Sequence, residues 1–147
     1  MTDDAAGQVL TPDDLKRITE EIENAKVREA LAKQKALEEH QERLRREFME
    51  RDLRPDAAER LNNVIRHAAE AGQHEVMLFK FPAAFCADKG RAINNFDPDW
   101  PQSLTGFARK AYDAYVEHLE PLGYRMHARI LDYPDGNLGD VGIFLSW

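Results

Sequence analysis

A short basic segment between a predicted strand and a predicted helix is the first place in this sequence where binding chemistry could occur. It reads DKGRAINNF and places Lys89, Arg91, Asn94 and Asn95 around Gly90. Cationic side chains beside amide groups are typical ligands for phosphate or carboxylate. A lone glycine between two basic residues matches no established phosphate-binding loop. The alternative is a connector whose charges pair with nearby aspartates.

A second polar segment, DYPDGNLGD, follows a later predicted strand and contains Asp132 and Asp140. In open sheets, ligands bind beyond the carboxyl ends of parallel strands. We expect the strands before the two segments to be parallel, so that both segments meet at one edge of the sheet. The predicted ligand-binding residues are Lys89, Arg91, Asn94, Asn95, Asp132 and Asp140.

The residues that covalent catalysis or metal binding would need do not occur at suitable spacings. Cys86 is the only cysteine, which excludes an intrachain disulfide and any paired-cysteine metal or redox motif. We interpret it as a small buried apolar residue, and leave open whether it is reactive. The histidines show none of the spacings of zinc ligands. The sequence therefore predicts no catalytic residue, no metal and no cofactor.

The charge balance argues against nucleic acid and anionic membranes as general partners. The 147 residues include 27 acidic and 20 basic side chains, which give a net charge of -7. Proteins that bind polyanions usually carry the opposite balance. No apolar run approaches membrane-spanning length, and the first residues, MTDDAAGQVL, are acidic where a signal peptide is basic. We therefore expect a cytoplasmic protein with no membrane or nucleic-acid partner.

A long charged helix is the first of the elements that must position these residues. We expect a disordered tail at residues 1–10. Thr11 and Pro12 then form a helix start, and neither proline nor glycine occurs between Pro12 and Pro55. We expect residues 11–54 to form a helical arm similar to a coiled coil, with a solvated helix as the alternative. Its two apolar registers supply the predicted interface residues Leu15, Ile18, Ile22, Leu37, Leu44 and Phe48.

The remaining residues, 55–147, predict a small domain in the order helix, strand, helix, strand, strand. We expect a three-stranded mixed sheet, with its first two strands parallel through a right-handed crossover and its last strand antiparallel. The fold class is therefore α+β, in two layers, with a long N-terminal helix. The predicted strands are Glu75–Phe81, Tyr124–Tyr133 and Val141–Trp147.

The predicted sheet also has a face that needs a partner. Alternation in the second strand places Arg125 and Arg129 away from the core, and we add both to the predicted interface. A small sheet with a half-apolar open face and exposed edges is usually covered. We expect a non-enzymatic protein whose helical arm forms a homodimer or docks a protein partner. The alternative is a binding protein or enzyme for a small anionic ligand at the loop edge.

Overall fold

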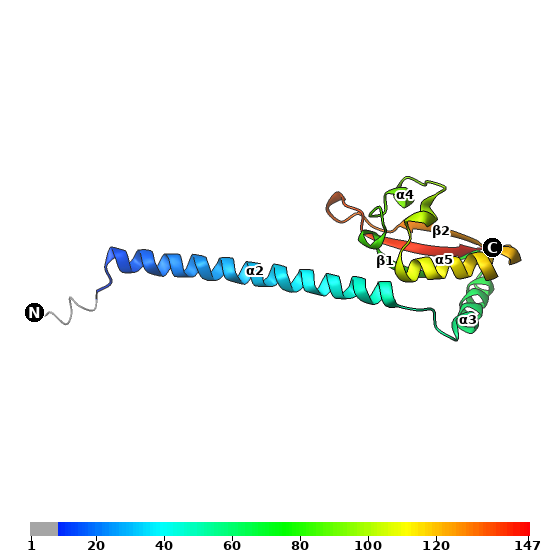
Figure 1. Cartoon of the computed structure of the whole chain (residues 1–147), viewed down its shortest axis with the longest axis horizontal. Coiled ribbons are helices and arrows are strands. Elements are labelled where there is room, and N and C mark those ends of the chain that lie inside the picture. The colour runs from blue at the N-terminus through cyan, green and yellow to red at the C-terminus, as the bar shows by residue number, and fades with distance from the viewer. Residues whose placement is uncertain (1–8) are drawn as a thin grey trace, which may run out of the picture. The chain divides into compact units, whose positions relative to one another are not determined.

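A computed structural model describes residues 9–147 (Figure 1). Most of the tail predicted at residues 1–10 lies outside the described residues. The chain divides into two compact units, of which the first ends at Leu44 and the second runs from Arg45 to Trp147. The predicted mixture of helix and sheet, with a long N-terminal helix, is confirmed.

Helix α2, Pro12–Glu50, is 39 residues long and contains no buried side chain. A capping box begins it, because the Thr11 hydroxyl accepts a hydrogen bond from the Asp14 backbone N–H at 3.1 Å, and the Asp14 carboxylate accepts one from the Thr11 N–H at 2.9 Å. The bond from the Thr11 backbone holds the pKa of Asp14 below its ordinary value. The sequence signal at Thr11 therefore marks a real helix start.

The second unit contains a single three-stranded sheet. Its strands are β1, Glu75–Pro82; β2, Arg125–Ile130; and β3, Asp140–Ser146. Strand β3 lies in the middle and pairs antiparallel with both neighbours, so the predicted mixed sheet with parallel adjacent strands is wrong. Strands β1 and β2 run in the same direction but are separated by β3. Because β3 is central, it carries the most completely buried side chains of the sheet, which are Val141, Ile143 and Leu145.

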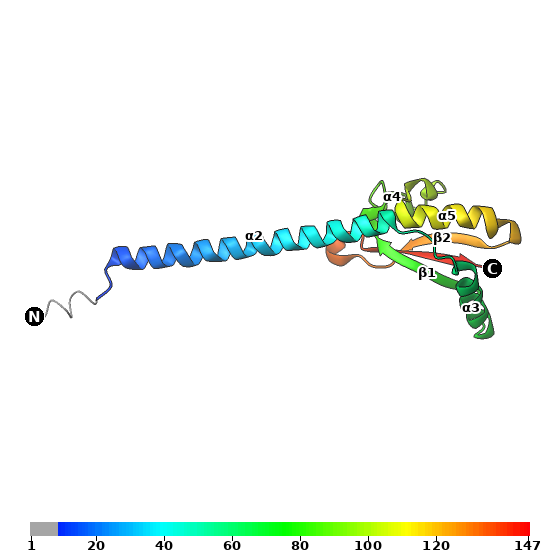
Figure 2. The same cartoon turned by 60° about the horizontal axis from the view of Figure 1, so that its bottom comes forward.

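The core lies on one face of this sheet. Helix α5, Gly106–His118, runs along that face and buries Phe107, Ala108 and Tyr115 (Figure 2). Thr105 is the N-cap residue of α5, and its hydroxyl donates a 2.5 Å hydrogen bond to the Phe85 carbonyl. The remaining helices are α3, Ala57–Glu70; α4, Arg91–Asn94; and the 3-10 turns Ala83–Phe85, Trp100–Ser103, Glu120–Leu122 and Pro134–Gly136.

The last turn of α2 belongs to the second unit and packs against its core through Phe48. The Phe48 ring lies 5.1 Å from the rings of Phe81 and Phe85, centroid to centroid, and 6.4 Å from that of Phe107. Aromatic rings at such distances stabilise a core beyond the area that they bury. Phe48, which the sequence placed at an interface between chains, is therefore used inside its own unit.

Gly106 permits the close approach of α5 to the end of α2. It has a φ of +52°, and a Cβ there would lie 2.8 Å from the Met49 Cα and the Phe48 carbonyl oxygen. Lys110, one turn later, donates to the Asp52 carboxylate at 2.7 Å. The contact therefore combines aromatic packing, a glycine and an ion pair.

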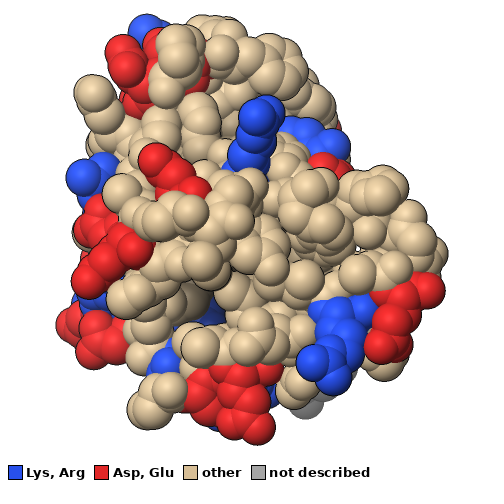
Figure 3. Space-filling view, turned by 90° about the vertical axis from the view of Figure 1, so that its right-hand side faces the viewer, with Lys and Arg blue, Asp and Glu red and all other residues tan. Residues whose placement is uncertain are grey.

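Surface charge in the second unit is mixed. At the end of the unit seen in Figure 3, acidic and basic side chains are interspersed among uncharged ones. No helix among the described residues is both long enough and apolar enough to cross a membrane.

Candidate functional site

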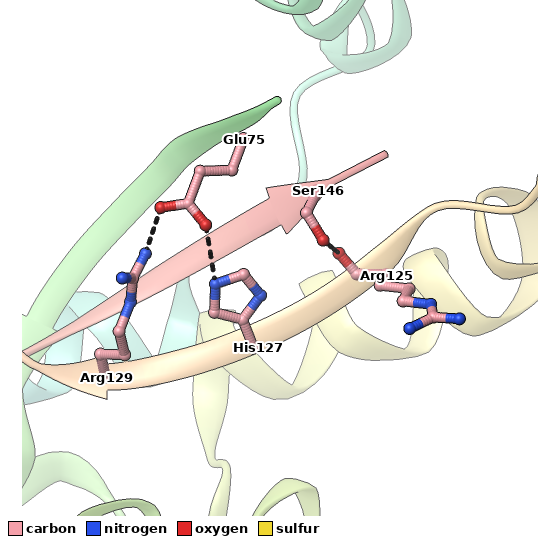
Figure 4. Close-up of polar contacts among 5 residues, drawn as sticks. All are labelled: Glu75, Arg125, His127, Arg129 and Ser146. Atoms are coloured by element: carbon pink, nitrogen blue, oxygen red, sulfur yellow. Dashed lines mark hydrogen bonds and ion pairs between the residues drawn. The ribbon is translucent and has the colours of Figure 1, made fainter. Parts of the chain in front are cut away.

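The face of the sheet opposite the core carries a group of charged and aromatic side chains (Figure 4). Alternation along β2 directs Met126, Ala128 and Ile130 to the core and Arg125, His127 and Arg129 to the other face. The register pairs His127 of β2 and Met77 of β1 with Phe144 of β3 on this open face. We call Glu75, His127, Arg129 and Phe144 the sheet-face cluster.

The Glu75 carboxylate connects the two outer strands across β3. One of its oxygens lies 3.2 Å from His127 Nε2, and the other accepts a hydrogen bond from Arg129 Nη2 (Figure 4). The Arg129 guanidinium carbon lies 3.8 Å from the centroid of the Phe144 ring, and the His127 ring is stacked on Phe144 at 5.4 Å between centroids. Each cationic or aromatic group is therefore held by at least two contacts.

The electrostatics of the cluster favour a charged carboxylate. The hydrogen bond from Arg129 lowers the pKa of Glu75, and the nearby charges of Arg129 and His127 act in the same direction. Partial burial opposes this effect but is the weaker influence. Glu75 is therefore ionised at neutral pH and matches the charge of Arg129.

An open hollow of about 450 Å³ lies beside the cluster. Met77, which borders it, is 44% exposed, and Leu131 elsewhere on the open face is 41% exposed. Gly142 lies beneath Leu131 and Phe144, since a Cβ there would come within 2.8 Å of both side chains. The open face thus carries exposed apolar side chains beside the charged groups that lie over Phe144. The hollow is lined by Gln73, His74, Glu75, Val76, Met77 and Phe144.

The predicted loop edge is brought together only in part. The Tyr133 hydroxyl donates to Asn94 Oδ1 at 2.9 Å, which places α4 beside the segment after β2. The Asp132 carboxylate accepts a hydrogen bond from the Asp140 backbone N–H at 2.7 Å and so holds its own turn. The two segments do meet at one edge, but the Asp132 carboxylate bonds within its own segment, and among residues 9–147 neither Asp132 nor Asp140 forms an ion pair.

The basic residues of this loop do not pair with the aspartates. Within residues 9–147, Lys89 and Arg91 form no ion pair. The loop is held by Asp88, whose carboxylate accepts hydrogen bonds from the N–H groups of Gly90 and Ala92, both at 2.9 Å. The remaining predicted residue, Asn95, is exposed at the end of α4. The loop therefore folds without using its positive charges.

Cys86 lies at the base of this loop and is 4% exposed. Burial raises the pKa of its thiol to about 11, and the charge of Asp88 adds to the increase. The thiolate is the reactive form of cysteine, so the side chain is a poor nucleophile at neutral pH. Its position agrees with the interpretation as a small buried apolar residue.

The predicted interface residues of the helical arm lie on an exposed surface. In α2, Leu15 and Ile22 are 51% and 52% exposed, and Leu37 is 56% exposed. Ile18 and Leu44 are slightly more covered, at 40% and 41%. Of the eight residues predicted at an interface, Phe48 alone is partly buried against a core. Arg125 is exposed on the open face of the sheet, and Arg129 belongs to the sheet-face cluster.

Sequence reasoning missed Glu75 and Phe144 as members of a site. In β3, alternation directs Phe144 to the opposite face of the sheet from Val141 and Ile143. This alternation is the signal that could have placed Phe144 on the open face. Glu75 reaches His127 and Arg129 only because β3 lies between β1 and β2. The predicted strand order therefore hid the cluster.

The cluster brings a carboxylate and an imidazole together. A carboxylate beside an imidazole can accept a proton, yet within residues 9–147 no hydroxyl or thiol hydrogen-bonds to His127. Ser146 donates instead, at 3.5 Å, to the Arg125 carbonyl (Figure 4). No group of three or more potential metal ligands occurs in the described part of the chain.

In comparisons with protein-family models, curated proteins and solved structures, nothing matched this chain. Its function has to be inferred from its own residues.

Proposed function

We propose that this protein is a non-enzymatic, self-associating protein of the cytoplasm, in which α2 pairs with α2 of a second copy. The observation that carries this proposal is the exposure of the helix, which contains no fully buried side chain and touches a core only through its last turn. Most helical stability in proteins comes from packing an apolar face, because isolated helices are marginal in water. A second copy carries the same apolar stripe and is always available.

The spacing of the stripe supports helix pairing. Leu15, Ile18 and Ile22 are separated by three and four residues, which is the spacing of the core positions in coiled coils. Leu37 and Leu44 continue the stripe one heptad apart in a second register. Association would bury the exposed half of each of these side chains, which is worth about 1 kcal/mol per residue.

The expected affinity follows from that estimate. Five side chains from each of two helices contribute about 10 kcal/mol, and association costs at least about 4 kcal/mol in lost freedom of motion. The difference corresponds to a dissociation constant on the order of 10–100 μM. Self-association should therefore be measured over a concentration range that extends well above 100 μM.

A matched pair of substitutions tests the stripe. Ile22 and Leu31 are both apolar and are 52% and 59% exposed, but nine residues turn a helix by about 180°, so they lie on opposite sides of α2. We expect Ile22→Glu to weaken dimerisation at least about 10-fold, because each dimer would then bury two carboxylates. Leu31→Glu should change it by less than about 3-fold, as measured by sedimentation equilibrium.

The full chain is the right material for this experiment. Deletion of the arm through Arg54 would remove Phe48 from the core and Met49 from its contact with Gly106. Circular dichroism should show unchanged helix content in both variants. Equal dimerisation by the two variants and the unchanged chain would contradict a seam through Ile22.

A second candidate function is the binding of a small anionic ligand at the loop edge. It is favoured by the exposure of Lys89 and Arg91, which form no ion pair among residues 9–147. If it holds, citrate or inorganic phosphate should raise the melting temperature, and Lys89→Ala with Arg91→Ala should abolish the increase. An unchanged melting temperature in the parent chain would leave Lys89 and Arg91 as plain surface residues.

A further inference from the structure

The open face of the sheet carries more cations than carboxylates, although the chain has a net charge of -7. Lys80 pairs in register with Gly142, so it lies on this face together with Arg125 and Arg129. The carboxylates that alternation places there are Glu75 and Asp140, at opposite ends of the sheet. A locally positive surface on an acidic protein attracts a negatively charged partner.

Two of these cations are free to pair with a partner. Lys80 and Arg125 are exposed and form no ion pair within the described residues. Arg129 and His127 already share the carboxylate of Glu75 from the same chain. Glu75 therefore occupies the position that a carboxylate of a partner would take beside Arg129.

The open face can also receive apolar side chains beside its charged groups. Phe144 is half-buried there, Met77 and Leu131 are 44% and 41% exposed, and the hollow of about 450 Å³ lies beside Phe144 and Met77. Exposed apolar side chains beside arginines are common at protein-binding surfaces. The surface thus offers both charge pairing and apolar contact.

Three classes of occupant differ in how well they fit. A second copy would bring the same cations face to face, which costs energy. A single-stranded nucleic acid would need a free aromatic ring for stacking, but the Phe144 ring already contacts His127 and Arg129. An acidic peptide needs only cations and exposed apolar side chains, and both are present.

We propose that the open face of the sheet binds an acidic, partly apolar peptide segment of a partner protein, with carboxylates at Arg125 and Arg129 and an apolar side chain against Met77 in the adjoining hollow. Glu75 competes with the incoming carboxylate for Arg129. This surface contains no residue of the α2 stripe, so the proposal stands independently of the dimer.

The test uses a fluorescein-labelled probe peptide with glutamates and leucines, titrated with the full chain at low salt and followed by anisotropy. Arg125→Gln and Arg129→Gln should each weaken binding at least about 5-fold, since each removes a cation that contacts a carboxylate. Glu75→Gln should strengthen binding at least about 3-fold because it removes the competitor. Arg125 lies outside the cluster, so its variant tests the proposal even if Arg129→Gln does not fold.

Matched controls lie on α5, which covers the opposite face of the sheet. Arg109→Gln removes a cation and Glu117→Gln removes an acid, and each should leave the affinity within about 2-fold of the parent. An eight-nucleotide thymidine strand tests the other polyanion class. No binding of the peptide at 1 mM, equal effects of Arg109→Gln and Arg125→Gln, no gain with Glu75→Gln, or tighter binding of the oligonucleotide would each overturn the proposal.

Discussion

Glu75 determines how the open face of the sheet is organised at the scale of single residues. Its two oxygens contact His127 and Arg129 from a strand that does not neighbour β2. The carboxylate therefore acts as a clamp across β3 and orients the two groups over Phe144. Removing it should loosen the outer strands and leave Arg129 without its partner.

The stability supplied by Glu75 should depend on pH. Its pKa is lowered in the folded chain, chiefly by the hydrogen bond from Arg129, so its contribution is present above the ordinary carboxyl range and is lost as the pH falls through the folded pKa. We expect Glu75→Gln to be less stable than the parent at pH 7 and equally stable at low pH. Urea unfolding from pH 7 to about pH 3 measures this difference.

Glu117→Gln serves as the control for Glu75. Glu117 is exposed on α5, and its only ion-pair contact within residues 9–147 is to His118 at 3.6 Å. Its variant should show no comparable pH-dependent loss. A constant difference between Glu75→Gln and the parent at all pH values would show that the carboxylate charge is not the source of the stability.

The loop edge shows how far chemistry could be predicted from residue types. The sequence placed Asn94 near the segment that follows the second strand, and the bond from Tyr133 to Asn94 joins those segments. It also suggested that Lys89 or Arg91 would pair with an aspartate, which does not occur among the described residues. Instead, the Asp88 carboxylate accepts hydrogen bonds from backbone N–H groups of the loop. The sequence does not distinguish an aspartate that makes such local hydrogen bonds from one that pairs with a cation.

The order of the strands is the main feature that could not be predicted at the scale of elements. Strand positions followed from alternation and from turn residues, and the observed β1, Glu75–Pro82, differs from the prediction by one residue. Sequence pattern says which residues share a face but not which strand takes the centre. Here β3 takes the centre, where Val141, Ile143 and Leu145 are fully buried.

The contact between α5 and the last turn of α2 can be tested with two glycines. Gly106 and Gly72 both have positive φ values, of +52° and +78°, but a Cβ at Gly106 meets Met49 and Phe48, while a Cβ at Gly72 meets nothing within 4 Å. We expect Gly72→Ala to cost about 1 kcal/mol from backbone strain. Gly106→Ala should cost about 2–4 kcal/mol, since a steric clash is added.

Thermal or urea unfolding of the full chain measures both glycine variants. Equal losses of stability would mean that the backbone of α2 does not approach Gly106 closely. The comparison isolates the contact, because the two substitutions introduce the same methyl group at positions that both have a positive φ.

At the scale of the whole molecule, the boundary between the two units falls inside one continuous helix. The sequence predicted a helical arm at residues 11–54, and the helix observed is Pro12–Glu50, whereas the compact second unit begins at Arg45. Helix propensity is high on both sides of this boundary, so no local signal marks it. The packing of Phe48 against Phe81 and Phe85, together with the close approach of Met49 to Gly106, assigns the last turn to the second unit.

The central claim is that exposed α2 side chains pair with those of a second copy. The most direct measurement is the mass of the unmodified full chain by sedimentation equilibrium, over loading concentrations from about 10 μM to about 500 μM. We expect the mass to rise from that of a monomer to twice that value, with a midpoint on the order of 10–100 μM. A monomer mass at every concentration would contradict the claim and leave α2 as a solvated helix.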